Sequence, residues 1–502
     1  MKIAFLPLDD RPSSVDYIEY LGRISGIEIE ILKSLALVET SFSHVDAAVL
    51  ALDRWIYGGL VESRIFEQSF EAAFEKLDQL KIILDAHPIP VYAYSILMRQ
   101  APSAFSEEEA LLADKIKEAS IERSRRFKWE NEVVDLNSSP VEKFSEVIST
   151  APEDLWNQYL SARKRNHAVN QRAITLVAEN RNVFLAIPLD DLTEEGLNQK
   201  EKKILEDRIL HEKLQDRTQI FPGTDETGLL LLVRAVLEKE RIIPRVFPVY
   251  DSSDPDQFRL KYEDCKLTEL VSLQLKAIGA ILENESKNAD FFLFVHVPQE
   301  NQIDVPLNPA LKYSDEWIHQ LKFHLAEGIP CALADLRYAN GSDKLFMRYL
   351  SQEIDFSKLL SFSAWNTSAN ALGIVLSHAI LRWFFLRRTS VKSLFENERG
   401  GELIGDSEEA HLEFMYLRLL EDWLYQAEIR PELTFKLRSE KRSTMNLPLD
   451  LKLRCENDVA QKLRDLSEQY LKDFSCKMSV EKVAFPWNRL FDIRIELRKR
   501  TF

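Results

Sequence analysis

Short apolar runs rich in β-branched and aromatic residues alternate along this chain with longer stretches of helical periodicity. This alternation is typical of βαβ units, in which crossover helices join parallel strands. Several runs are apolar on both faces, as expected of strands that helices cover on both sides. The predicted strands are residues 2–8, 47–52, 90–97, 183–189, 218–221, 245–250, 291–297, 330–336 and 359–365. A weaker run, 27–32, alternates isoleucine with glutamate, which favours a half-exposed edge strand.

The predicted fold class is α/β, either a (β/α)8-like barrel or open doubly wound parallel sheets. Residues 106–180 show helical periodicity without a strand-like run, which predicts a helical insertion. Beyond about residue 390, charged amphipathic stretches such as 410–427 and 456–474 predict a C-terminal helical region. We therefore expect an α/β domain over 1–390 that carries the insertion, and a helical region over 391–502.

Composition restricts the classes of partner. The formal net charge of −16 argues against a nucleic-acid or anionic-membrane surface. No secretory signal is visible, and the four cysteines lack metal-type spacing, so we expect a cytoplasmic protein with reduced thiols. The most apolar stretch, 371–386, contains His378 and Arg382 and predicts a buried helix rather than a membrane span.

One phrase, Pro-Leu-Asp-Asp, ends two of the predicted strands, at 7–10 and at 188–191. Two adjacent carboxylates repel each other, so they gain nothing from proximity unless a cation, a substrate or a shared proton compensates. A single copy would suit an Asx turn or a helix cap equally well. The recurrence of the phrase favours a functional site over a turn or a helix cap.

Ligands of parallel α/β folds bind at the carboxyl ends of strands, so the residues there are the candidate site. Asp190 and Asp191 are the candidate catalytic pair. The candidate substrate-binding residues are Asp9, Asp10, Arg11, Asp53, Tyr57, Arg64, Arg99, Asp225, Glu226, Tyr250, Trp365, Asn366 and Asn370. Repulsion among Asp9, Asp10, Asp190, Asp191 and Asp225 should raise at least one carboxyl pKa unless Arg11, Arg64 and Arg99 or a metal offset it.

Two of the strand-end groups can be interpreted as structural instead of functional. Trp365 could stack on a sugar ring while Asn366 and Asn370 bind hydroxyls, but Asn366 or Thr367 could equally cap the following helix. His296, alone at a strand end, is interpreted as a structural histidine.

The first strand is followed by no GxGxxG, and the chain contains no P-loop, nucleophile elbow or HExxH motif. What remains is chemistry carried by acids. Paired carboxylates suit glycoside cleavage, in which one acid protonates the leaving oxygen and the other stabilises the oxocarbenium-like centre. The sequence thus predicts an enzyme acting on a small carbohydrate, without a cofactor. Two alternatives stay open: a hydrolase or isomerase whose aspartates ligate a divalent cation, and a sugar-binding protein without turnover.

Several motifs together resemble a bacterial family known as domain of unknown function 4127. They are the opening 7–12 segment, Tyr-Gly-Gly-Leu at 57–60 with Ser63 and Arg64, Asp190-Asp191 followed by Gly196 and Glu201, the block 222–226, and the block 365–370. The similarity spans about residues 1–390. The chain departs from the expected pattern at Thr224, where the family pattern has alanine.

A second resemblance suggests an activity. Retaining β-N-acetylglucosaminidases of the O-GlcNAc-hydrolase type have a (β/α)8 barrel with adjacent aspartates after the fourth strand and a Pro-Thr-Glu-type segment after the fifth. Here Asp190-Asp191 ends the fourth strong run, and the segment 223–226 ends the fifth. The resemblance implies that Asp190 orients an acetamido group and that Asp191 is the general acid and base.

Overall fold

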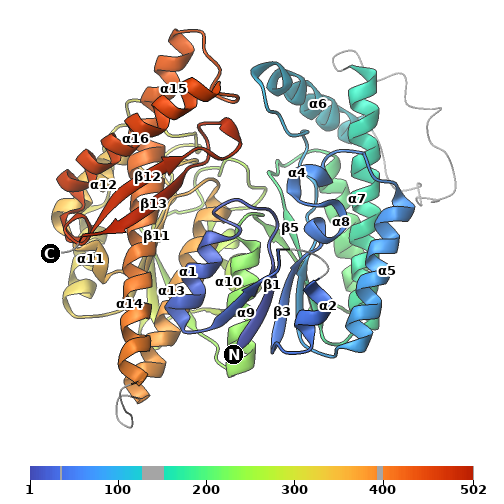
Figure 1. Cartoon of the computed structure of the whole chain (residues 1–502), viewed down its shortest axis with the longest axis horizontal. Helices are drawn as coiled ribbons and strands as arrows, with labels where there is room; N and C mark the ends of the chain where they lie inside the picture. Colours follow the sequence, from blue (N-terminus) through green and yellow to red (C-terminus); the bar gives the residue numbers. More distant parts are fainter. Residues whose placement is uncertain (34–36, 127–151, 393–398, 501–502) are drawn as a thin grey trace. The chain divides into compact units, whose positions relative to one another are not determined.

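The computed structural model describes residues 1–33, 37–126, 152–392 and 399–500 (Figure 1). The chain forms two compact units, each built on a parallel sheet. Unit A comprises Ala4–Asp9 and Ile31–Thr224. Unit B comprises Met1–Ile3, Asp10–Glu30 and Asp225–Phe502.

Sheet A, most of whose residues belong to unit A, is open and has six strands. Their order is β2 (Glu28–Ile31), β1 (Lys2–Leu6), β3 (Ala47–Ala51), β4 (Val91–Tyr94), β5 (Val183–Leu189) and β6 (Thr218–Pro222). The pairs from β3 to β6 are parallel. The order reverses between β1 and β3, and such a switch point is where open α/β sheets bind ligands.

Helices cover sheet A because their apolar residues recur at helical spacing. In α5 (Phe70–Ala86), Ala73, Leu77, Leu80 and Leu84 are buried, and they share a core with α7 (Glu153–Glu179), which lies beside α5 in Figure 1. The other helices of unit A are α2 (Leu37–Phe42), α3 (Leu52–Tyr57), α4 (Leu60–Ser63), α6 (Glu107–Arg126) and α8 (Leu197–His211). The expected insertion contains α6 and α7, and its residues 127–151 lie outside the described ranges.

The sheet of unit B, sheet B, has the order β11 (Ser361–Ser363), β10 (Cys331–Asp335), β9 (Phe291–His296), β7 (Arg245–Tyr250) and β8 (Ile281–Leu282). All of its pairs are parallel. Its switch point lies between β7 and β9, so the two sheets repeat the same winding.

The helices of unit B are α1 (Asp16–Ser25), α9 (Thr227–Glu240), α10 (Leu267–Ile278), α11 (Asp315–Ala326), α12 (Lys344–Glu353), α13 (Ser368–Lys392), α14 (Arg399–Arg418), α15 (Arg430–Ser439), α16 (Leu449–Tyr470) and α17 (Lys472–Ser475), with 3-10 turns at Ser286–Asn288, Phe356–Lys358 and Pro486–Asn488. Helix α13 packs on β10, β11 and α9. Its segment Ser368–Thr389 has the length and apolarity of a membrane span, but 94% of its most apolar window is buried inside the protein. The predicted buried helix is confirmed.

Helix α14 continues as a π-helix, η5, over Leu419–Ile429, and all eleven of these residues are buried. Long π-helices are rare, and π-turns are frequent at functional sites. The sequence predicts a helix over 410–427 but gives no sign of this wider winding.

All ten predicted strands form, most with shorter ends. They lie in two open sheets, as the doubly wound alternative expects, and no closed barrel appears among the described residues. The region after 390 is helical but also holds an antiparallel hairpin, β12 (Met478–Ala484) with β13 (Arg494–Lys499), which packs on α16. The four cysteines are free thiols.

Candidate functional site

The carboxyl ends of the central strands of sheet A carry a group of ion pairs that we call the Asp190–Asp191 site. Asp190 follows β5, and its Oδ2 accepts a hydrogen bond of 2.5 Å from Nη2 of Arg64. Both side chains are nearly buried, 7% and 8% exposed. Nη1 of Arg64 donates to Oγ of Ser103 at 2.9 Å, while its buried Nε has no partner among the described residues. Burial lowers the pKa of Arg64 despite the opposing charge of Asp190.

Asp191 pairs with a different arginine. Nη1 of Arg99 donates to its Oδ2 at 2.9 Å, and the two side chains are 29% and 32% exposed. The backbone of Asp191 has φ of +42°, a left-handed conformation that few side chains other than Asn and Asp tolerate. Non-glycine residues held in this region are concentrated at functional sites. The neighbouring carboxylates therefore occupy different environments.

Asp53 follows β3 and is buried beside this pair. Its Oδ2 accepts a 2.9 Å hydrogen bond from the backbone N–H of Ile96. Burial raises the pKa of Asp53 to about 7, and the charge of Asp190 adds to the rise, while the bonds from Ile96 and Ser63 oppose it. Asp53 is not one of the five aspartates for which repulsion is predicted to raise a pKa, and desolvation rather than like charge is the main cause here.

Helix α7 positions the loop that carries Arg64, a role that the sequence analysis missed. Arg165 donates to the backbone oxygens of Ser63 at 2.7 Å and of Ile65 at 3.1 Å, and its guanidinium lies 4.2 Å from the ring centre of Tyr57. Asn166 donates to the same Ser63 oxygen at 2.8 Å. Tyr57 is thus part of the support for this loop, and its hydroxyl is buried without a partner in the described structure.

A second arginine of α7 holds the segment with Arg99. Arg163 donates to the backbone oxygens of Met98 and Arg99, each at 2.9 Å, and to Oε2 of Glu201 at 2.7 Å. Burial raises the pKa of Glu201 to about 7 although the charge of Arg163 opposes the rise. Polar residues at helical spacing on the buried face of a helix, such as Arg163, Asn166 and Asn170, are the signal that could have revealed these contacts.

Unit B carries a smaller group, the Asp225 site. Nη2 of Arg11 donates to Oδ1 of Asp225 at 2.5 Å, with both side chains nearly buried, and Nδ2 of Asn366 donates to the other carboxylate oxygen at 3.2 Å. Asn366 adopts φ of +61° at the end of β11. Arg11 lies 5.3 Å from the ring centre of Trp487.

Other predicted residues of unit B lie in or beside its packed interior. Glu226 lies at the start of α9, accepts a 3.0 Å hydrogen bond from Gln274, and fits against Gly373 of α13. Trp365 and Asn370 are buried, each with a polar atom that has no partner in the described structure. Burial raises the pKa of Tyr250, at the end of β7.

The structure therefore divides the predicted residues between the two units. Asp9, Asp53, Tyr57, Arg64, Arg99, Asp190 and Asp191 belong to unit A, and Asp10, Arg11, Asp225, Glu226, Tyr250, Trp365, Asn366 and Asn370 belong to unit B. The three arginines named as charge compensators each pair with one acid: Arg64 with Asp190, Arg99 with Asp191, and Arg11 with Asp225.

His296 lies in a buried charge cluster at the switch point of sheet B. Its Nδ1 is 2.5 Å from Oδ2 of Asp251, and its Nε2 is 3.8 Å from Oδ2 of Asp343. Burial alone would lower the pKa of His296, but the charge and the hydrogen bond of Asp251, together with the nearby Asp343 and the charge of Asp335, raise it to about 10. Because the ring is fully buried, the cluster is consistent with the structural role expected of this histidine.

No three His, Cys, Asp or Glu side chains within the described ranges are arranged to hold a metal ion.

Comparison with known proteins identifies the family. The model for the family described as "Protein of unknown function (DUF4127)" matches residues 3–496. The chain belongs to this family. No match was found among curated proteins. The family similarity therefore extends beyond residue 390, through the C-terminal helices and β12.

Proposed function

We propose that this DUF4127 protein is a glycoside hydrolase-like enzyme that acts on a small carbohydrate through Asp190 and Asp191. The observation that supports the proposal is that the two neighbouring carboxylates differ in burial and in the arginine with which each pairs. Asp190 is nearly buried against Arg64, whereas Asp191 is about one-third exposed against Arg99. Acid and base roles are divided between two carboxyl groups when their environments differ.

In the proposed reaction Asp191 is the general acid and Asp190 its partner, as the resemblance to O-GlcNAc-hydrolase-type enzymes implies. That resemblance is carried by short motifs, and an N-acetylhexosamine is accordingly the first substrate to test. The positive charge of Arg99 opposes protonation of Asp191. Binding of the substrate must therefore break the ion pair between Arg99 and Asp191. Because this pair is partly exposed, breaking it costs little free energy.

The first prediction concerns Asp191→Asn, which keeps the shape of the side chain and removes its proton. Turnover of a natural glycoside should fall by about 10²–10⁴-fold, the usual contribution of general acid catalysis. An activated aryl glycoside should suffer less, because its leaving group needs little protonation. The measurement is a screen of 4-nitrophenyl and natural glycosides, with and without chelator, across pH 5–9. Activity of the unsubstituted protein should decline on the alkaline side.

Asp207→Asn is the matched control, since Asp207 lies exposed on α8 and pairs with Lys203. Normal turnover by Asp191→Asn would overturn the proposal. Loss of activity with chelator would favour the metal-dependent alternative, and carbohydrate binding without turnover would favour a sugar-binding protein. The expected cytoplasmic location belongs to the same proposal.

A further inference from the structure

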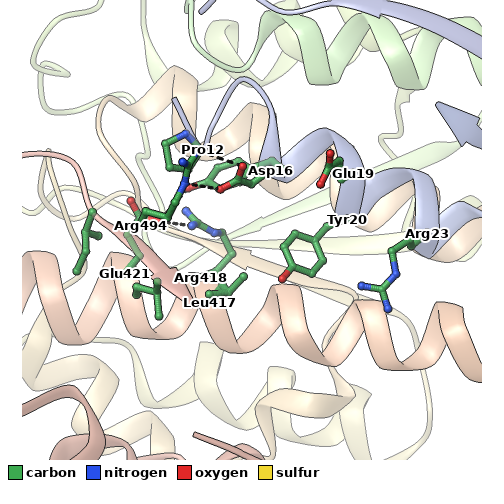
Figure 2. Close-up of a pocket in the computed structure, with 12 residues that line it drawn as sticks. Pro12, Asp16, Glu19, Tyr20, Arg23, Leu417, Arg418, Glu421 and Arg494 are labelled. Carbon is green, nitrogen blue, oxygen red and sulfur yellow. Dashed lines mark hydrogen bonds and ion pairs between the residues drawn. The ribbon is translucent and has the colours of Figure 1, made fainter. Parts of the chain in front are cut away.

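Unit B contains a pocket of about 220 Å³ whose lining includes none of the predicted site residues (Figure 2). Its walls are formed by α1, by the junction of α14 with the π-helix, and by the start of β13. In Figure 2, Tyr20 and Arg418 lie toward its centre, between α1 and the helix that carries Leu417. A volume below the roughly 300–1,000 Å³ of drug-binding pockets suits a ligand with a single ring.

The charges that line this pocket are balanced. Three arginines, Arg23, Arg418 and Arg494, face it together with three acids, Asp16, Glu19 and Glu421. Each arginine already bonds to a carboxylate. Nε of Arg494 lies 3.0 Å from Oδ2 of Asp16, and Nη1 of Arg23 lies 2.9 Å from Oε2 of Glu413. An anionic ligand would have to displace one of these carboxylates, so the pocket disfavours anions.

The floor of the pocket is a buried polar network built by the π-helix. Arg418, at the end of α14, bonds to Glu421 and, at 3.0 Å, to Oδ1 of Asp422. The hydroxyl of Tyr17 donates to Oε2 of Glu421 at 2.9 Å. Nε of Arg418 is buried and has no partner among the described residues. This nitrogen is not accessible from the pocket, so the network closes the floor, and the groups open to a ligand are those at the rim.

Paired guanidinium and carboxylate groups keep further N–H donors and lone pairs after pairing. At the rim of this pocket Arg494 lies beside Asp16, and a hydroxyl group, which both donates and accepts, complements such a pair. The partly exposed side chains of Tyr20 and Ile495 add apolar surface for the C–H face of a ring.

We propose that this pocket binds a neutral polyhydroxylated molecule with one ring, such as a monosaccharide or a cyclitol. Arg494 and Glu19 at the rim supply the hydrogen bonds. The site shares no residue with the proposed catalytic pair, so it goes beyond the proposed function and does not depend on it.

The test is calorimetric and saturation-transfer NMR titration of the full chain with glucose, N-acetylglucosamine and myo-inositol, and with phosphate and citrate as anionic probes. At least one of the neutral compounds should bind saturably. Arg494→Gln and Glu19→Gln should each weaken that binding by about tenfold or more, the effect of losing a hydrogen bond to a charged group. The side chain of Arg494 is 42% exposed, so its replacement should leave the fold intact.

Arg498→Gln is the matched control, because Arg498 lies exposed on the same strand outside the pocket. This variant should bind the ligand as the unsubstituted protein does. Asp191→Asn should also bind normally, which separates this proposal from the catalytic one. The proposal is overturned if no neutral compound binds, if only phosphate or citrate binds, or if binding is lost in Asp191→Asn while Arg494→Gln and Glu19→Gln retain it.

Discussion

Arginine–aspartate pairs are the recurring device at the carboxyl ends of the strands. Asp190 and Asp225 are each paired in a nearly buried position, and Asp191 in a more open one. A buried pair is costly to desolvate and is weak support for stability, but breaking it leaves an uncompensated charge. These pairs therefore fix where the carboxylates lie more than they stabilise the fold.

Asp53 provides a pH-dependent prediction. Its pKa is about 7 in the folded chain, against about 3.9 in an unfolded one. Between these values the folded state holds a proton that the unfolded state has released. The contribution of Asp53 to the free energy of unfolding thus falls as pH rises from about 4 to 7 and is constant above. Asp53→Asn cannot titrate, so its stability relative to the unsubstituted protein should improve from pH 5 to pH 8.

The measurement is urea unfolding at both pH values, followed by near-UV circular dichroism. Asp207→Asn, on the exposed face of α8, is the control and should show little change in relative stability. An equal stability difference for Asp53→Asn at both pH values would mean that Asp53 does not carry the proton in the folded state.

At the scale of elements, the strands could be predicted because they are buried and almost continuously apolar, as in Val183–Leu189. The order of the strands in the sheets could not be predicted, because local periodicity does not indicate which strands pair. A closed barrel and two open sheets both produce the same alternation of strands and helices along the chain. The residues at the ends of the strands could be predicted from the sequence. The pairing of Arg64 with Asp190 could not, because it joins positions 126 residues apart. The hairpin strand β13 was overlooked although its charged and apolar residues alternate over Arg494–Lys499.

Helix α13 gives a prediction about close packing. A Cβ on Gly373 would lie 2.1 Å from Cγ of Glu226, which Gln274 holds in place, so Gly373→Ala forces a shift of α13 or α9. We expect a loss of about 1–3 kcal/mol in the free energy of unfolding, typical of overpacking. Gly405→Ala is the matched control within α14. Nothing lies within 4 Å of its added Cβ, so it should be neutral or stabilise by about 0.5–1 kcal/mol.

Chemical unfolding of the two variants beside the unsubstituted protein decides this point. Equal stability of Gly373→Ala and Gly405→Ala would show that the contact between α13 and α9 is loose.

At the scale of the whole molecule, the two units are not consecutive in sequence. Helix α1 lies between β1 and β2 of sheet A along the chain, yet it packs on α13 and α14 in unit B. Its buried residues include Tyr17, Ile18 and Leu21, and the ring of Tyr17 meets Phe414 at 5.2 Å. Unit B therefore includes a segment, Asp10–Glu30, that is synthesised about two hundred residues before the rest of the unit.

This arrangement predicts that residues 225–502 alone will not form a well-packed domain, because the surface that α1 covers becomes exposed. The fragment should bind a hydrophobic dye and lack a cooperative thermal transition. A synthetic peptide of residues 10–30 should restore the transition, and the same peptide with Leu21→Asp should not. A fragment that unfolds cooperatively without any peptide would contradict the prediction.

The position of α1 also has a consequence for biosynthesis. The helix leaves the ribosome early, but its partners end only at Arg418. At translation rates of roughly 5–20 residues per second, the apolar face of α1 waits about 20–80 s for them. During that interval the nascent chain presents Tyr17, Ile18 and Leu21 to whatever holdase chaperones reach it first.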